Sequence, residues 1–377
     1  MGRDPLLRLL LVGNYGLNVA YCCRSWAHPI AAAPPSARIF LGSWRVHHPC
    51  PLPSFDGGFP DATSVDAVTA LCDRQRVEVV LGVDVGGTKL ANAVRRRRPA
   101  LAYTAAMDDE RLDALSDKVR FAGALRRDGL PEPDTEPAED ADRLVALCAR
   151  RGYPLVVKPA VGEGGFGATI LRCDDDMRAY AARARSTWWP LAVQRFLPGA
   201  EFSVSAVVHA GEVMGMSVHH WLAPGVLRYA PHPQAEQMAR RAIERLGIDG
   251  PVNFDMRADD SGRPHFMECN TRYWGTLNLA GAAGANFVEL AARAALGERI
   301  PFRPPLQDCV LMTLDAAVRR LRLPSDWLSL SPPARQALLQ EAADLGALTS
   351  RAQASLGRRL GRRNRRRQPA ILLRPAG

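Results

Sequence analysis

The segment from Val252 to Arg272 constrains the fold more than any other part of the chain. It reads Val-Asn-Phe-Asp-Met-Arg-Ala-Asp-Asp-Ser-Gly-Arg-Pro-His-Phe-Met-Glu-Cys-Asn-Thr-Arg. Polar and apolar residues alternate on both sides of the Ser-Gly pair, and a period of two is typical of strands with one buried face. The segment therefore predicts an antiparallel hairpin with strands at 252–258 and 264–270.

The register of this hairpin follows if Ser261-Gly262 is a two-residue turn, because Asp255 then faces Glu268 across the ladder. Alternation predicts a core face that carries Phe254, Met256, Met267 and Cys269. It gathers the polar residues on the other face: Asn253, Asp255, Arg257, Glu268, Asn270 and Arg272.

Two carboxylates placed opposite each other repel, and a hard divalent cation removes that repulsion. Asn270 adds a third oxygen ligand to Asp255 and Glu268. The polar face therefore predicts a Mg²⁺ site of the kind that bridges phosphates. The alternative is a solvated face on which Arg257 and Arg272 neutralise the acids.

The lysines point to the same chemistry, since the chain has only Lys89, Lys118 and Lys158 beside 46 arginines. Lysine is a compact point charge that suits a tight phosphate pocket, whereas arginine is a wide planar fork. Lys158 ends an apolar run just before the loop Gly162-Glu-Gly-Gly-Phe-Gly167, and Lys118 opens a helical stretch. A lysine, a glycine loop and a later carboxylate pair predict a nucleoside triphosphate site. The alternative is that codon bias left a few lysines at arbitrary places.

The glycine loop matches the dinucleotide-binding pattern at Gly162, Gly164 and Gly167, but that pattern requires a helix after the turn. The residues that follow, 168–173, are strand-like. Ala168 also stands where a Walker loop needs its lysine. The loop is therefore expected to be a flap between two strands whose N–H groups fold over phosphates, or else a flexible hairpin turn.

Taken together, these motifs resemble the ATP-grasp superfamily over roughly residues 116–300, and the ending Glu-x-Asn-x-Arg resembles its carbamoyl-phosphate-synthase-like branch. The resemblance implies ATP and Mg²⁺ (or Mn²⁺) as cofactors. It also implies a ligase that joins a carboxylate to an amine or ammonia through an acyl phosphate, forming ADP and phosphate.

The resemblance further implies roles for particular residues. The phosphates would be contacted by Lys118, Lys158 and the loop glycines Gly162, Gly164, Gly165 and Gly167. The adenine hinge would be formed by Gln194, Phe196 and Leu197, and ribose would be bound by Glu201. The metal would be held by Asp255, Glu268 and Asn270, and Arg272 would act with Lys158 and Asn270 in catalysis. No general base stands out, although His219 and His220 are candidates. Substrate groups are expected from loops at 13–18, 219–229 and 272–276.

The fold class expected is α/β with an α+β ATP-grasp core. An N-terminal Rossmann-like parallel sheet occupies residues 1–106, with strands at 6–12, 37–41 and 77–83 and helices at 17–26, 64–75 and 89–97. The expected small lobe with the flap is 107–193, helical at 108–125, and the large lobe with antiparallel sheets and the metal site is 194–305. Residues 306–377 are expected to be proline-broken helices and an Arg-rich tail.

One rival motif is Asp84-Val-Gly-Gly-Thr-Lys89, which resembles the phosphate loop of ROK-type sugar kinases. It follows several βα units and no second phosphate loop comes after it, so we interpret it as a loop at the end of a strand. A further alternative to the ligase is an ATP-binding protein of this fold without turnover.

The net charge of +10 is concentrated in the tail, because residues 351–377 hold nine arginines and no acid, leaving 40 basic against 39 acidic residues elsewhere. The body therefore gives no reason to expect specific nucleic-acid binding.

The eight cysteines form no metal or redox motif, which favours a cytoplasmic protein. No run of 18 apolar residues predicts a membrane span. The expected partners are small-molecule acids and amines, and a homodimer is compatible with the sequence.

Overall fold

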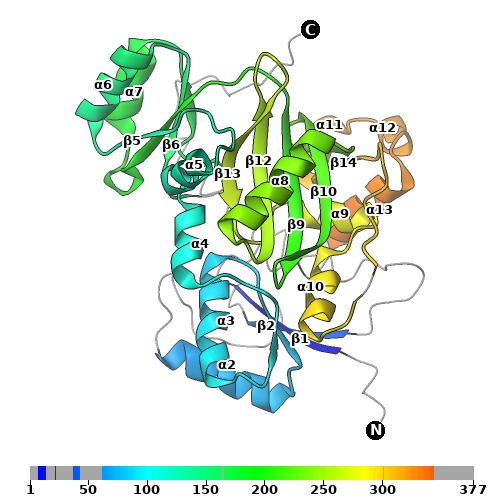
Figure 1. Ribbon diagram of the computed structural model, residues 1–377. Coiled ribbons are helices and arrows are strands. Elements are labelled where there is room, and N and C mark those ends of the chain that lie inside the picture. Colours follow the sequence, from blue (N-terminus) through cyan, green and yellow to red (C-terminus); the bar gives the residue numbers. More distant parts are fainter. Residues whose placement is uncertain are drawn as a thin grey trace.

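The computed structural model describes residues 7–13, 22, 37–42, 62–162, 165–299 and 301–343. These residues form one parallel sheet and two antiparallel sheets with helices packed around them (Figure 1). The predicted helix at 17–26, apart from Cys22, and the Arg-rich tail lie outside the described residues.

The N-terminal sheet is parallel, as the repeated βα pattern predicts. Its inner side chains, among them Leu10, Val12 and Val80, are buried beneath Val68 and Leu90 of two helices. Its strands run in the order β2-β1-β3-β4. The elements are β1 (Leu7–Val12), β2 (Ala37–Gly42), α2 (Ala62–Gln75), β3 (Val79–Gly82), α3 (Val85–Arg97) and β4 (Ala102–Tyr103).

The interpretation of residues 84–89 as a loop is wrong, because α3 already begins at Val85. Asp84 is its N-cap, and the Asp84 carboxylate accepts a hydrogen bond of 2.7 Å from the Gly87 N–H. A Cβ on Gly87 would lie 2.0 Å from the carbonyl oxygen of Val12. The absence of a side chain at Gly87 therefore lets α3 start directly against strand β1. This packing explains the glycines of the motif at 84–89 without a bound phosphate.

The small lobe is an antiparallel sheet of order β5-β8-β6-β7. Strand β6 pairs with β7 across the glycine loop, so a strand and not a helix follows that loop, as predicted. The elements are β5 (Glu136–Ala138), α6 (Ala141–Arg151), β6 (Leu155–Pro159), β7 (Thr169–Leu171), α7 (Asp174–Arg183), a 3₁₀ turn (Ser186–Trp188) and β8 (Leu191–Arg195).

The helical stretch expected at 108–125 is two helices, α4 (Asp109–Ser116) and α5 (Lys118–Arg127). Asp117 has an extended backbone and caps α5 by accepting from the N–H groups of Val119 and Arg120. This break makes Lys118 the first residue of α5, as its predicted role at the start of a helix requires.

The large sheet is antiparallel and has the order β13-β12-β9-β10-β11-β14. Helices α4, α5 and α8 bury one face, and α10 packs between the other face and the N-terminal sheet, with α9 next to α10 (Figure 1). The elements are β9 (Glu201–His209), β10 (Glu212–Ala223), β11 (Val226–Tyr229), α8 (Pro233–Leu246), β12 (Gly250–Ala258), β13 (Pro264–Asn270), α9 (Leu277–Ala282) and α10 (Phe287–Ala295).

Two expectations about this sheet need correction. Residues 219–229 are not a loop, since they belong to β10 and β11 and the turn between them. Residues after 305 are not only helices, because β14 (Val310–Met312) adds an edge strand beside β11. The helices that follow are α11 (Leu314–Arg320), α12 (Pro324–Leu328) and α13 (Pro332–Ala343).

The hairpin β12–β13 has the predicted pairing of Asp255 with Glu268, but for a different reason. Asp259 and Arg263 close a three-residue loop, with Gly262 in the left-handed conformation, so the turn is one residue longer than predicted. A bulge between Asp255 and Met256 then shifts the register back. Phe266 therefore takes the core position that was predicted for Met267, which is half-buried outside the core.

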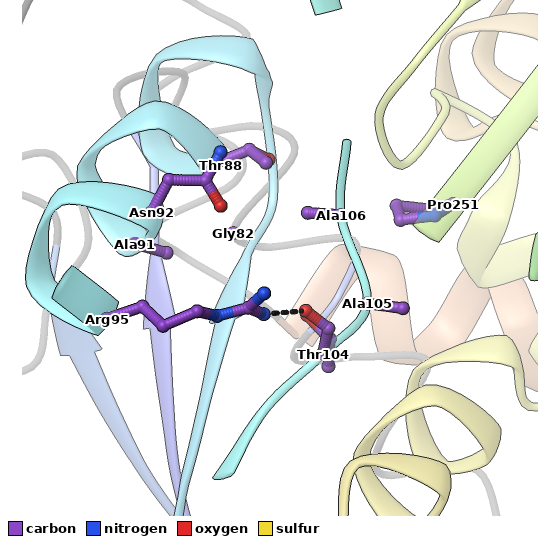
Figure 2. Close-up of a pocket in the computed structure, with 9 residues that line it drawn as sticks. All are labelled: Gly82, Thr88, Ala91, Asn92, Arg95, Thr104, Ala105, Ala106 and Pro251. Atoms are coloured by element: carbon purple, nitrogen blue, oxygen red, sulfur yellow. Dashed lines mark hydrogen bonds between the residues drawn. The ribbon is translucent and has the colours of Figure 1, made fainter. Parts of the chain in front are cut away.

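A small cavity marks the junction between the N-terminal sheet and the large lobe (Figure 2). Its volume is about 10 Å³, enough for roughly one water molecule. Figure 2 shows Arg95 of α3 reaching across to the carbonyl oxygen of Thr104, to which its guanidinium donates a 3.0 Å hydrogen bond. This cavity is too small for a nucleotide and lies away from the acid pair.

Candidate functional site

The centre of the candidate site is the pair Asp255 and Glu268, which lie opposite each other on β12 and β13. Three polar neighbours support the Asp255 carboxylate. The Ser203 hydroxyl donates to it at 2.8 Å, the Asn253 amide at 2.9 Å and the Asn270 amide at 3.1 Å. All three of these donors are neutral, so none of these contacts places a cation beside Asp255.

The two lysines converge on the other carboxylate. The Nζ atoms of Lys158 and Lys118 lie 3.4 and 3.7 Å from the same oxygen of Glu268. Both lysines are buried, at 8% and 6% exposure. Lys118 also donates to the carbonyl oxygen of Gly162 at 2.9 Å, which ties α5 to the first glycine of the loop.

These contacts divide the charge unequally within the pair. Burial, and then the charge of Glu268, raise the pKa of Asp255 to about 7. Burial also acts to raise the pKa of Glu268, but Lys158 and Lys118 outweigh it and bring that pKa to about 2. Glu268 is therefore the charged member near neutrality, while Asp255 titrates near neutrality, where a divalent cation would compete with its proton.

Asn270 lies between the acids and Arg272. Its amide nitrogen points towards Asp255 and Glu268, and its oxygen accepts from the Arg272 guanidinium at 3.1 Å. The amide must turn over for its oxygen to face a metal. Arg272 is buried and also donates to the carbonyl oxygen of Tyr273.

The glycine loop connects β6 to β7 beside this pair, and Gly164 lies outside the described residues. Gly162, Gly165 and Gly167 all have positive φ angles, which L side chains rarely adopt. A Cβ on Gly167 would lie 2.8 Å from the Pro159 ring, and the Tyr180 hydroxyl donates to the Gly167 carbonyl oxygen. The loop therefore needs glycine on both sides of its tip.

The segment expected to hold adenine begins at Gln194, which is buried at 1% exposure. Its amide nitrogen donates to the Thr135 hydroxyl at 3.0 Å and to the Met267 carbonyl oxygen at 3.3 Å, while its amide oxygen has no partner among the described residues. Phe196 is half-buried and Leu197 is fully buried.

Glu201 lies at the start of β9, on the same face as Asp255. The Arg257 guanidinium pairs with it at 3.3 Å and also lies 5.6 Å from the centre of the Phe196 ring. Arg257 therefore links the expected ribose and adenine positions and does not neutralise Asp255 or Glu268 in any contact the structure shows.

Two participants were not predicted from the sequence, Ser203 and the carbonyl group of Met267. Ser203 donates to Asp255 together with Asn253, which was predicted on the same polar face, and the alternation of β9 could have pointed to Ser203. The carbonyl oxygen of Met267 accepts from both Lys158 and Gln194. The Met267 carbonyl is free to accept these bonds because of the bulge in the β12–β13 pairing. No pattern in the sequence predicts this bulge.

The donor set fits a magnesium ion better than a transition metal. No group of three or more His, Cys, Asp or Glu side chains that could hold a metal occurs in the described part of the chain. Two carboxylates and an amide are hard oxygen donors, and Mg²⁺ bound to phosphates needs only one or two carboxylates.

No described helix is long and apolar enough to cross a membrane.

Two family models match overlapping parts of the chain. Residues 117–197 match the ATP-binding domain of the carbamoyl-phosphate synthase L chain. Residues 188–318 match the model described as ATP-grasp in the biosynthetic pathway with Ter operon. The two matches together contain every candidate site residue.

Curated relatives include carbamoyl phosphate synthase large chains. The one from Rubrobacter xylanophilus is 28% identical over 257 residues, which cover 63% of this chain and 24% of the relative. The one from Pyrococcus furiosus is 24% identical over 231 residues, covering 57% of this chain and 22% of the relative. This chain thus matches about a quarter of the length of these relatives.

Solved structures share the fold at low sequence identity. An L-amino acid ligase from Bacillus licheniformis has a TM-score of 0.55 and 17% identity, with 79% of this chain and 78% of that one covered. A carboxyaminoimidazole ribonucleotide synthase from Aspergillus clavatus, complexed with ATP, has a TM-score of 0.60 and 16% identity, with 85% and 87% covered.

Proposed function

We propose that this chain, which belongs to the ATP-grasp superfamily, is an ATP-dependent ligase that joins a carboxylate to an amine or ammonia. In this reaction the carboxylate attacks the γ-phosphorus of ATP, ADP leaves, and the amine then displaces phosphate from the acyl phosphate. The observation that carries the proposal is the convergence of Lys118, Lys158 and the pair Asp255–Glu268 within one buried face.

Catalysis by these residues is mainly electrostatic. Phosphoryl transfer spreads negative charge over the transferred group, and fixed cations stabilise that charge. We propose that Lys158 and Lys118 leave Glu268 in part to contact the phosphates, and that Arg272 holds the acyl phosphate. The N–H groups of the glycine loop, including Gly162, Gly165 and Gly167, would cover the β- and γ-phosphates.

Asp255, Glu268 and Asn270 would hold Mg²⁺, or Mn²⁺, once the Asp255 proton is lost. When bound, the metal supplies positive charge against the triphosphate. The unpaired amide oxygen of Gln194 would accept from the adenine amino group, with Phe196 and Leu197 beside the base. Glu201 would accept hydrogen bonds from ribose.

The test is metal-dependent ADP release with a screen of carboxylate and amine pairs. Glu268→Gln should abolish ADP release while the circular dichroism spectrum is unchanged, because the variant loses a metal ligand and the charge that orders both lysines. Asp260→Asn is the matched control, since Asp260 is an exposed acid in the turn of the same hairpin. Wild-type turnover in Glu268→Gln would refute the proposed metal site.

The same screen separates a ligase from a nucleotide-binding protein without turnover. A ligase releases ADP faster when both substrates are present than with MgATP alone. A protein that binds MgATP but releases no ADP with any pair would support the alternative.

A further inference from the structure

The polar face of the large sheet continues beyond the acid pair for three more strands, β9, β10 and β11. Asp255 pairs with Ser203, Ser203 with His219, and His219 with Tyr229, so these side chains form one row across four strands. Neighbouring strands are about 4.8 Å apart, which places His219 roughly 10 Å from Asp255. In the next row of the same face, Ser205 pairs with Ser217.

The far end of this face differs from the near end in its hydrogen bonding. Near the acids, Ser203 donates to Asp255 and Ser205 donates to Asn253, each at 2.8 Å. Further along, the Ser217 hydroxyl, both ring nitrogens of His219 and the Tyr229 hydroxyl have no hydrogen-bond partner in the described part of the molecule.

The three side chains that carry these unpaired atoms are buried, with exposures of 6% for Ser217, 1% for His219 and 1% for Tyr229. Burying a polar group without a partner destabilises a protein, and native structures contain few such groups. Four unpaired atoms on adjacent positions of one face therefore need a common explanation.

The chemistry of the three residues indicates which group they suit. The His219 ring packs edge-on against Trp221 and Tyr229, with ring centres 5.4 and 5.9 Å away. Burial lowers the pKa of His219 to about 3 and raises that of Tyr229, so both are uncharged near neutrality. Together with Ser217 they offer neutral donors and acceptors, which match a hydroxyl or carboxamide group better than an ion.

We propose that Ser217, His219 and Tyr229 form a recognition subsite for a neutral hydroxyl or carboxamide group on the carboxylate substrate. This inference rests on the proposed function, because it takes the acid pair as the place of the transferred phosphoryl group. The substrate carboxylate then lies near Asp255 and Glu268, and its polar substituent extends along the row towards His219. The subsite selects the substrate by pairing atoms that the folded chain leaves unpaired.

The first test measures the melting temperature of the full-length protein without ligands. Tyr229→Phe and Ser217→Ala should melt at or above the wild-type temperature, because each removes an unpaired buried hydroxyl. Ser205→Ala is the matched control and should melt lower, since it breaks the bond to Asn253. If Tyr229→Phe and Ser217→Ala both melt as low as Ser205→Ala, the hydroxyls are paired within the protein and the inference is wrong.

The second test measures how small acids raise the melting temperature in the presence of MgADP. The probes are hydroxy and carboxamide acids, each beside its apolar isostere, such as threonine with valine and asparagine with leucine. At least one polar acid should bind the wild type tenfold or more better than its isostere. Tyr229→Phe and His219→Phe should remove that preference.

His220→Phe is the matched control for this second test, because His220 lies on the opposite face of β10, beside Phe202 and His232. It should keep the preference. A wild type that prefers no polar acid, or a Tyr229→Phe variant that keeps the preference, would overturn the inference. A wild type that does not bind MgADP would instead refute the proposed function. The first test would still apply in that case, because the order of the ligand-free melting temperatures does not depend on nucleotide.

Discussion

At the scale of single residues, the three lysines of this chain have different tasks, although all are buried. Lys89 pairs with both oxygens of Asp113, at 2.7 and 2.8 Å, and so joins α3 to α4. Lys118 and Lys158 instead share one oxygen of Glu268 at longer distances. The longer contacts suit side chains that we propose also bind a phosphate.

Replacing Lys158 with arginine tests this difference. We expect at least a tenfold loss in kcat/KM for ATP, or about 1.4 kcal/mol of transition-state stabilisation, because the wide guanidinium does not fit the place of an ammonium group beside Glu268 and Met267. Steady-state ADP release measures the effect. Lys89→Arg is the control and should remain active, since a guanidinium can also pair with both oxygens of Asp113. Equal activity of the two variants would remove Lys158 from the phosphate site.

The protonation of Asp255 predicts how pH changes the response to magnesium. Its pKa is raised from about 3.9 in an unfolded chain to about 7, so without metal the folded protein loses stability as pH rises through this range. We expect Mg²⁺ to take the place of the proton and to raise the melting temperature more at pH 8 than at pH 6. Thermal denaturation with and without MgCl₂ measures this. An equal rise at both pH values, or the same pH dependence in Asp255→Asn, would contradict the prediction.

At the scale of elements, close contacts between small residues place the helices. Gly87 lies inside α3 against the end of β1, where a Cβ would meet the Val12 carbonyl oxygen at 2.0 Å. Gly123 lies inside α5, and a Cβ there would have no neighbour within 4 Å. These two helical glycines therefore differ only in their surroundings.

Alanine at the two positions should have opposite effects on the free energy of unfolding. Gly87→Ala should lose about 1–3 kcal/mol, because α3 must move away from β1. Gly123→Ala should gain about 0.5–1 kcal/mol, because alanine is the better helix former and no clash opposes it. Urea denaturation of both variants measures the effects. If Gly87→Ala were as stable as the wild type, the tight start of α3 would not be needed.

At the scale of the whole molecule, the net charge of +10 arises mostly from residues outside the described part of the chain. Removal of residues 357–377 takes away eight arginines and no acid, which leaves a net charge near +2. We expect such a protein to elute earlier from a cation-exchange column and to keep its ADP-forming activity, since every candidate site residue lies between 118 and 272. Loss of activity or of folding would place the tail within the catalytic unit.

The sequence by itself determined much of the architecture, because side-chain periodicity follows directly from strand and helix geometry. The alternation in 252–272 predicted the β12–β13 hairpin, and the apolar runs before residue 106 predicted the parallel sheet. The pairing of Asp255 with Glu268 was also predicted, although two one-residue shifts, a longer turn and a bulge, cancel to produce it.

Only the tertiary structure decided which groups meet across the lobes. The bulge turns the carbonyl oxygen of Met267 towards Lys158 and Gln194, and Ser203 reaches Asp255 from a strand 52 residues away in sequence. The unpaired row from His219 to Tyr229 likewise depends on the register between β10 and β11. Register and bulges result from packing between distant segments, and local sequence carries no energy term for such contacts.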